Sequence, residues 1–191
     1  LESRLKAVYD WSCTWGVDFS LRKTRHIVFC PNGKFHQGRI SFGNSIVTKT
    51  STYKYLGITF QQSLRFDDYA SQILIPKVRG LLGNYRRLLC FTGEGRCTFG
   101  RILWNSKIRS ILEYGCGIWS SAVSTKYITE IDNLQSSFFK SIMGVPSFAS
   151  TLSTLTDMAV VRESERFNAF RLKLAIRLQK GLVPNCVSKL Y

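Results

Sequence analysis

Acidic residues are scarce in this sequence. Aspartate and glutamate number 12 against 27 lysines and arginines in 191 residues, which gives a formal net charge of +15. The basic residues occur in every region rather than in one tail. Such an excess repels itself in a folded chain, and a polyanionic partner relieves that repulsion. We therefore expect a nucleic acid as the partner, before a membrane surface.

Groupings of cysteine and histidine are also lacking. The six cysteines are widely spaced with no C-x-x-C pair, and the only histidines are His26 and His36. Neither a zinc site nor a disulfide framework follows from this spacing. Free thiols indicate a reducing compartment, so we expect an intracellular protein, nuclear or cytoplasmic, with an organelle as the alternative.

Long apolar runs and a leader sequence are absent as well. No stretch approaches the roughly 18 apolar residues that a membrane span needs, and the chain opens on Leu1 without a cationic leader. We expect a protein without a membrane partner, cut from a longer chain.

Catalytic groups are sparse too. Chemistry with two metal ions needs converging carboxylates, yet only Asp67-Asp68 and the pair Glu163 and Glu165 lie close together in sequence, each without a third acid. No Ser/His/Asp or Cys/His arrangement and no Gly-x-x-x-x-Gly-Lys loop is evident. We expect no catalysis and no cofactor from this chain alone.

The first 65 residues predict a small α/β segment. Apolar residues at helical spacing predict an amphipathic helix over 1–15 that ends at Gly16. Strands are expected over 26–30, 39–42 and 46–49, with a hairpin turn at Gly43-Asn44.

The stretch Thr52–Phe60 is the strongest strand signal, because β-branched and aromatic residues crowd into nine positions. We interpret it as one strand that closes an antiparallel sheet. On that reading Tyr53, Tyr55 and Gly57 share a face, and the bare backbone at Gly57 admits close approach of another chain. An ordinary buried strand has the same composition.

After residue 63 the hydrophobic period changes from 2 to 3.6, which predicts an all-helical part and an α+β fold overall. Asp67 or Asp68 is expected to cap the first helix, and Pro76 to kink or break it. The serine- and threonine-rich segment 147–156 is typical of a connector. The expected helices cover 67–89, 99–112, 125–143 and 160–180.

Three motifs in order resemble the reverse transcriptase of non-LTR (LINE-type) retrotransposons, from the end of the palm into the thumb. They are Gly16-Val-Asp-Phe-Ser-Leu-Arg-Lys23-Thr24 before the strand at 27–29, Tyr53-Lys-Tyr-Leu-Gly-Ile58, and Ile111-Leu-Glu-Tyr-Gly115 with Trp119. The resemblance weakens after about Pro146. It implies a palm remnant over 1–65 with a primer-grip-like hairpin, a thumb-like helical domain over 66–146, and a connector with a basic helix over 147–191.

The resemblance also implies roles for single residues. It makes Lys23 the lysine that helps to protonate the pyrophosphate leaving group, and it assigns Tyr55, Leu56 and Gly57 to the primer grip. The family uses Mg²⁺, but its catalytic Phe/Tyr-x-Asp-Asp motif is absent here, and Ser20 stands where asparagine is usual. The triplet Phe66-Asp67-Asp68 lacks the spacer residue, so we interpret it as a helix cap.

Basic residues along the helices are candidates for phosphate contact, with an ordinary solvated surface as the alternative. In the last helix, five of them form one stripe opposite Phe167, Leu174 and Leu178. Trp104, Trp119, Phe138 and Phe139 are expected to pack in the core. The candidate nucleic-acid-binding residues are Lys54, Tyr55, Leu56, Gly57, Lys77, Arg86, Arg87, Arg101, Lys107, Arg109, Arg162, Arg166, Lys173, Arg177 and Lys180.

Three functions fit these patterns. The first is the part of a reverse transcriptase that grips the template–primer, as RNA or an RNA/DNA duplex. The second is a domesticated remnant that acts as a non-catalytic RNA-binding or scaffold subunit among other ribonucleoprotein subunits. The third is an interaction module whose charge meets an acidic protein. An upstream Phe/Tyr-x-Asp-Asp would separate the first two, and nuclease-sensitive co-purification would separate both from the third.

Overall fold

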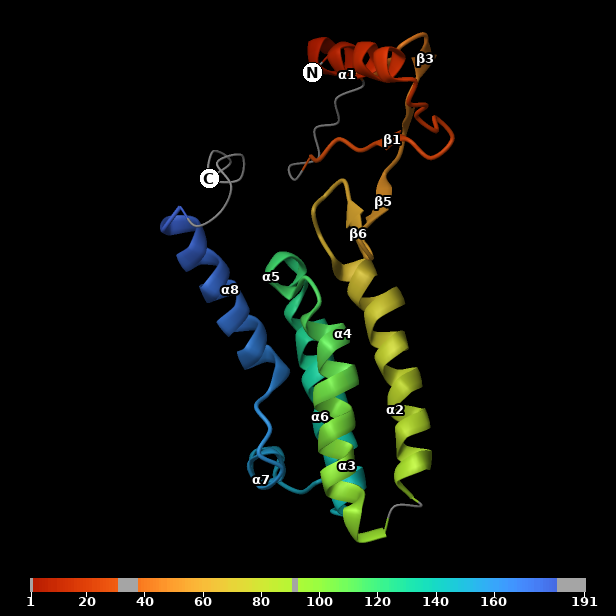
Figure 1. The fold of residues 1–191 in the computed structure, drawn as a ribbon. Helices are drawn as coiled ribbons and strands as arrows, with labels where there is room; N and C mark the ends of the chain where they lie inside the picture. The colour runs from red at the N-terminus through yellow and green to blue at the C-terminus, as the bar shows by residue number, and fades with distance from the viewer. Residues whose placement is uncertain (1, 31–37, 91–92, 182–191) are drawn as a thin grey trace. The chain divides into compact units, whose positions relative to one another are not determined.

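The computed structural model describes residues 2–30, 38–90 and 93–181. It confirms the α+β class. The chain forms two compact units, Leu1–Arg65 and Phe66–Tyr191, and each is considered by itself (Figure 1). The further division at residue 146 stays a prediction.

The first unit begins with helix α1 (Glu2–Trp15), which ends before Gly16 at a φ of 64°, as the sequence predicts. Its apolar face is less buried than the periodicity suggests. Val8 and Trp11 are exposed, and Ser12 is the residue of α1 that is buried. Tyr9 instead packs edge-on against the ring of Phe42, with 5.5 Å between the ring centroids.

The expected single antiparallel sheet is wrong, because the strands pair two by two. β1 (Arg25–His26) runs parallel to β4 (Thr48–Lys49). β2 (Ser41–Phe42) and β3 (Ser45–Ile46) form the hairpin predicted at Gly43-Asn44.

The strand predicted over 26–30 is only two residues long. Its pairing with β4 ends at His26, whose carbonyl accepts a bond from Thr50 N–H at 2.9 Å. Farther along, Cys30 N–H donates to the carbonyl of Gln62 at 2.8 Å, so this end of the segment turns to a different part of the chain. The apolar residues between them have strand composition, but a strand also needs a neighbouring backbone in register.

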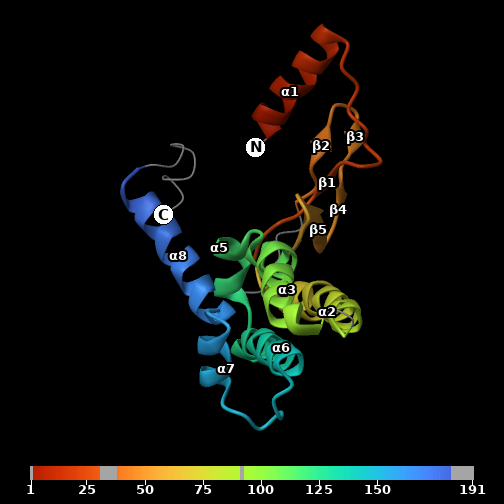
Figure 2. The same cartoon turned by 60° about the horizontal axis from the view of Figure 1, so that its bottom comes forward.

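The second unit is a helical bundle, in which the long helices lie side by side in both views (Figure 1, Figure 2). Helices α2 and α3 each contact α6, and α8 contacts α5 and α6. The bounds are α2 (Ile75–Leu89), α3 (Arg96–Leu103), α4 (Arg109–Glu113), α5 (Cys116–Trp119), α6 (Thr125–Met143), α7 (Thr151–Asp157) and α8 (Glu163–Gln179), with π-helical segments η1 (Tyr69–Leu74) before α2 and η3 (Trp104–Ile108) between α3 and α4.

Pro76 does not break its helix. The π-helical segment η1 leads directly into α2, and Ile75 N–H donates to the carbonyl of Ala70, five residues back. Helical residues precede Pro76, so it does not stand at a helix start, and the π-helical turn before it accommodates a residue that has no N–H to donate. The helix changes its hydrogen-bond pattern at this point and continues to Leu89.

The core of the bundle is aromatic, as predicted. Trp104, Trp119, Phe138 and Phe139 are completely buried. The ring of Trp104 stacks on Phe138 with 5.7 Å between centroids, and Trp119 meets Phe167 edge-on at 5.1 Å. These contacts give the large aromatic residues a packing role.

Helix α6 has the predicted bounds and ends at Gly144, whose φ of 72° suits a left-handed cap. The predicted connector over 147–156 is wrong in part, because α7 occupies Thr151–Asp157. The oxygen Oγ of Ser150 accepts a hydrogen bond from Ser153 N–H at 3.3 Å. Serine and threonine are typical of loops but also begin helices in this way.

We expect opposite effects on stability from two helix glycines. A Cβ built on Gly100 would lie 2.3 Å from Cδ1 of Ile142, which is buried where α3 meets α6, whereas a Cβ on Gly80 would meet nothing within 4 Å. Gly100→Val should lower the free energy of unfolding by about 1–3 kcal/mol through overpacking. Gly80→Ala, its control, should raise it by about 0.5–1 kcal/mol, since alanine favours helix. Urea unfolding of both variants measures this, and a stable Gly100→Val variant would contradict the packing.

Candidate nucleic-acid interface

The stretch 52–60 is a hairpin rather than one strand, which corrects our interpretation. β5 (Thr52–Tyr55) pairs antiparallel with β6 (Ile58–Gln61), so that Tyr53 lies opposite Phe60 and Tyr55 opposite Ile58. The turn residues Leu56 and Gly57 have φ of 47° and 86°. Positive φ at both central positions is what a tight hairpin turn needs, so Gly57 serves the turn conformation.

The tip of this hairpin is exposed. All of β5 is exposed, with Tyr55 at 59%, and Leu56 is exposed by 70%, whereas Ile58 is buried. Asparagine is favoured over leucine at the first turn position, because Cβ crowds the backbone at positive φ and the short polar side chain of asparagine can compensate with a local hydrogen bond. The hairpin therefore holds a large apolar side chain at the surface, at a cost in conformational energy.

The motif lysine Lys23 lies in a turn before β1. Its N–H and that of Thr24 both donate to the carbonyl of Ser20 at 3.0 Å, and the Thr24 hydroxyl donates to the same oxygen at 2.9 Å. The Lys23 side chain is exposed. Its role in leaving-group protonation stays a prediction.

On the helical unit, the predicted basic residues differ in their surroundings. Lys77, Arg87, Arg101 and Lys107 are exposed, and Arg87 donates to Oδ1 of Asn84 at 3.2 Å. Arg86 is half-buried and donates to the Ser137 hydroxyl at 2.9 Å. Contact of these residues with nucleic acid stays a prediction.

The predicted stripe on α8 divides into two sets. Arg166 forms an ion pair with Glu113 and faces the bundle. The other four, Arg162, Lys173, Arg177 and Lys180, are exposed, with the first and last at the two ends of the helix.

The expected apolar side of α8 is only partly correct. Phe167 is buried, but Leu174 is 36% exposed and Leu178 is intermediate. Leu174 lies close to α5, since a Cβ on Gly117 would come 3.4 Å from its Cδ2. From Arg171 onward the helix lies mostly at the surface, so a single apolar side is less well defined than the period suggests.

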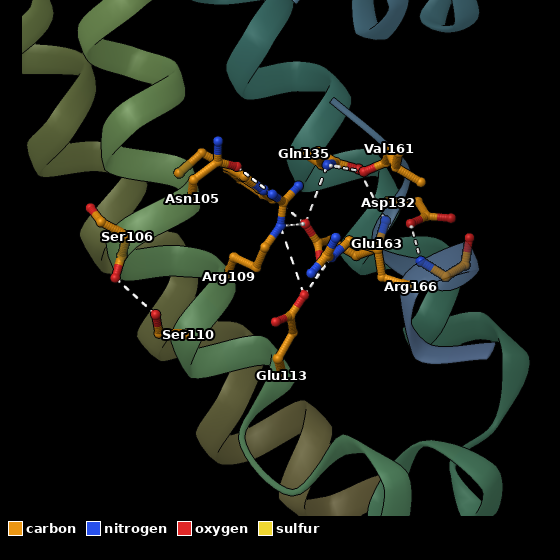
Figure 3. Close-up of polar contacts among 12 residues, drawn as sticks. Asn105, Ser106, Arg109, Ser110, Glu113, Asp132, Gln135, Val161, Glu163 and Arg166 are labelled. Atoms are coloured by element: carbon orange, nitrogen blue, oxygen red, sulfur yellow. Dashed lines mark hydrogen bonds and ion pairs between the residues drawn. The ribbon is translucent and has the colours of Figure 1, made fainter. Parts of the chain in front are cut away.

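A buried polar cluster ties α8 to the bundle (Figure 3). The carboxylate of Glu163 is completely buried, and its Oε1 accepts hydrogen bonds from Trp104 Nε1 at 2.8 Å and Arg109 Nε at 3.2 Å. Arg109 also lies 3.9 Å from Glu113, which pairs with Arg166. Arg109 and Arg166, two of the predicted phosphate-binding residues, therefore form ion pairs that hold helices together.

The amide of Gln135 completes this cluster from α6. Its Nε2 donates to the carbonyl of Val161 at 3.0 Å and to Glu163 Oε1 at 3.4 Å, and its Oε1 accepts from Glu163 N–H at 3.3 Å. Asp132, one turn earlier, accepts from Ser164 N–H at 3.1 Å. Two side chains of α6 thus satisfy backbone groups at the start of α8.

Burial raises the pKa of Glu163 above its ordinary value, and the Trp104 hydrogen bond and the Arg109 guanidinium oppose that rise. Within the part of the chain that the structure describes, its second oxygen, Oε2, is buried without a hydrogen-bond partner. The net direction means that desolvation outweighs the favourable contacts. The cluster is therefore a structural network with a charge that is costly to bury.

The carboxylate of Asp67 joins two helices. Its two oxygens accept from Ser124 N–H at 2.7 Å and from the Ser124 hydroxyl at 2.8 Å. Ser124 is the N-cap residue of α6. We expected Asp67 or Asp68 to cap its own helix, but Asp68 makes no capping bond there, and the chain's fold brings the start of a different helix to Asp67.

The described residues were compared with the requirements of a metal site and of a membrane-spanning helix. Among residues 2–30, 38–90 and 93–181, no three histidine, cysteine, aspartate or glutamate side chains gather closely enough to hold a metal ion. In the same residues, no helix has both the length and the apolar composition to cross a membrane.

Comparison with known proteins places the chain near retrotransposon polymerases. It is 22% identical, across 99% of its length, to the RNA-directed DNA polymerase from mobile element jockey of Drosophila funebris, and equally so to that of Drosophila melanogaster. The chain spans one fifth of the length of these relatives. No family model and no solved structure matches the chain. The similarity supports a distant relation to reverse transcriptases.

Several structural residues escaped the sequence reasoning. Glu163 follows Arg162 and precedes Glu165, so it has the pattern of a surface charge. Its cation, Arg109, lies 54 residues away. Gln135 and Asp132 carry no motif either, because the groups that they contact at the start of α8 are brought to them only by the fold.

Proposed function

We propose that this chain is the part of a retrotransposon-type RNA-directed DNA polymerase that grips the template–primer, and that the catalytic carboxylates are supplied from outside it. The similarity across 99% of the chain to the jockey polymerases supports this assignment. The net charge of +15 supports a nucleic-acid ligand. The hairpin tip, with the primer-grip motif, is the proposed point of contact in the first unit.

The observation that carries the proposal is the exposure of Leu56 at positive φ. Its side chain is 70% exposed, and its φ of 47° is a conformation that leucine rarely adopts. A residue held in strain and kept at the surface is typical of a contact site for a ligand. An RNA/DNA duplex would cover Leu56 and Tyr55, burying apolar surface on sugars or bases while Lys54 reaches a phosphate.

Replacement of Leu56 by asparagine tests this proposal. Asparagine suits positive φ, so the Leu56→Asn variant should be more stable than the wild type by about 1 kcal/mol. Its affinity for an RNA/DNA duplex should nevertheless fall about tenfold, because the buried leucine surface is lost. Urea unfolding and fluorescence anisotropy with a labelled template–primer measure the two effects.

Ile46→Asn provides the matched control. Ile46 is 67% exposed in β3, within the other antiparallel hairpin of the first unit, so the same loss of apolar surface occurs away from the motif. We expect its duplex affinity to equal that of the wild type. Equal affinities of the Leu56→Asn variant and the wild type would contradict a grip at this turn.

A further inference from the structure

A serine-rich cleft with two cations lies on the helical unit. It has a volume of about 350 Å³ and is formed by α2, by the C-terminal half of α6 and by the segment that follows α6. The lining residues are Arg86, Ser136, Ser137, Lys140, Ser141, Val145 and Ser147. None of these carries a carboxylate, so the cleft combines positive charge with hydroxyl groups.

Only part of the hydrogen-bonding capacity of Arg86 is used by the described protein groups. One of its terminal nitrogens donates to the Ser137 hydroxyl at 2.9 Å. Its Nε is buried and donates to none of the protein groups in the described ranges. An unsatisfied buried N–H is costly. The planar guanidinium as a whole carries five N–H donors, which suits it to an oxygen anion in the cleft.

Lys140 is held near the same space by a backbone group. Its Nζ donates to the carbonyl of Ser147 at 2.8 Å, which leaves the other two ammonium hydrogens for further acceptors. The partial negative charge at the C-terminal end of α6 opposes an anion here. Gly144 N–H and Val145 N–H cover the carbonyls of Ser141 and Lys140, at 3.4 and 3.1 Å, and two full positive charges outweigh what is left of the dipole.

We propose that this cleft binds a phosphate group of a nucleic-acid strand. A phosphodiester offers oxygen acceptors to the guanidinium, the ammonium and the serine hydroxyls at once, and these donors are the ones that contact phosphates in such complexes. A volume of about 350 Å³ leaves room for the adjoining sugar. The assignment to a strand rests on the proposed template–primer function, and it adds Lys140, Ser137, Ser141 and Ser147 to the binding surface.

The first test uses the full chain with Arg86→Gln and Lys140→Gln combined. Loss of the one phosphate contact made in the cleft should lower the slope of log affinity against log salt by about 0.9 for a duplex. The control variant combines Lys126→Gln and Arg171→Gln, which remove the same charge at exposed positions outside the cleft. We expect the control to keep the wild-type slope. Equal slopes for the cleft variant and the control would overturn the proposal.

The Ser137→Asp variant provides a second test, which remains informative if the double variant does not fold. Ser137 is exposed, and an aspartate there would pair with Arg86 and repel phosphate. We expect an unchanged melting temperature and at least tenfold weaker duplex binding. Wild-type affinity in this folded variant would overturn the proposal.

Inorganic phosphate separates the cleft from the template–primer function. In nuclear magnetic resonance spectra, phosphate titration should shift the Arg86 Nε–H signal of the wild type and leave that of the Ser137→Asp variant in place. If phosphate shifts the Arg86 signal but the chain binds no duplex, the cleft binds free anions only. That result would overturn both the strand assignment and the proposed function. Duplex binding without the shift would overturn the cleft alone.

Discussion

Replacing Arg109 by methionine is expected to lower the free energy of unfolding of the helical unit by about 3–5 kcal/mol at neutral pH. Methionine retains much of the arginine's apolar bulk but removes the cation that lies 3.2 Å from the carboxylate of Glu163. The carboxylate is completely buried, so it cannot recover its lost partner from water. Breaking one side of a buried ion pair is costly for this reason.

The size of this effect should depend on pH. The folded-state pKa of Glu163 is raised, chiefly by burial. Stability from such a carboxyl is fully present below its unfolded pKa of about 4.3 and is lost as pH rises through the folded value. Loss of Arg109 raises the folded pKa further, so the difference between variant and wild type should shrink as the pH is lowered from about 7 toward 4.

Chemical unfolding at several pH values measures both statements. Arg109→Met combined with Glu163→Gln should regain most of the stability, because a neutral amide can still accept the Trp104 hydrogen bond. Arg79→Met is the control, since Arg79 pairs with Glu130 at an exposed position and should cost at most about 1 kcal/mol. A cost for Arg109→Met as small as that for Arg79→Met would show that the buried pair contributes little.

The second large effect is expected on nucleic-acid binding by α8. Lys173, Arg177 and Lys180 are exposed, and we expect each to contact a phosphate. Replacing all three by glutamine should reduce the slope of log affinity against log salt by about 2.7, and reduce the affinity about 100-fold or more in 0.1 M salt. Stability should change by only a few tenths of a kcal/mol per site. Duplex titrations between 50 and 200 mM salt measure the slope.

Arg166→Gln separates binding from packing on the same helix. Arg166 pairs with Glu113, so its loss should lower stability and leave the salt slope unchanged. The variant with Lys173, Arg177 and Lys180 replaced should keep its stability and lose part of the salt slope. If it keeps the wild-type slope, the exposed part of α8 is a solvated surface, and phosphate contacts belong on the helices between Lys77 and Arg109.

Much of the helical unit could be predicted from the sequence alone. Helix α6 was predicted at its observed bounds, because its apolar residues keep helical spacing and Gly144 can adopt the left-handed cap. The burial of Trp104 and Phe138 was predicted for the same reason. Local periodicity and capping are properties of neighbouring residues, so they can be read without knowledge of the rest of the chain.

Tertiary structure decided the contacts between distant residues. Strand composition predicted β-structure over 52–60, but the positive φ of Leu56 and Gly57 turned it into a hairpin, and a leucine at that position gave no local warning. Asp67 and Glu163 had the patterns of a helix cap and a surface charge. Their partners, Ser124 and Arg109, lie more than 50 residues away, and only the packing of helices determines which side chains meet and which charges lose their water.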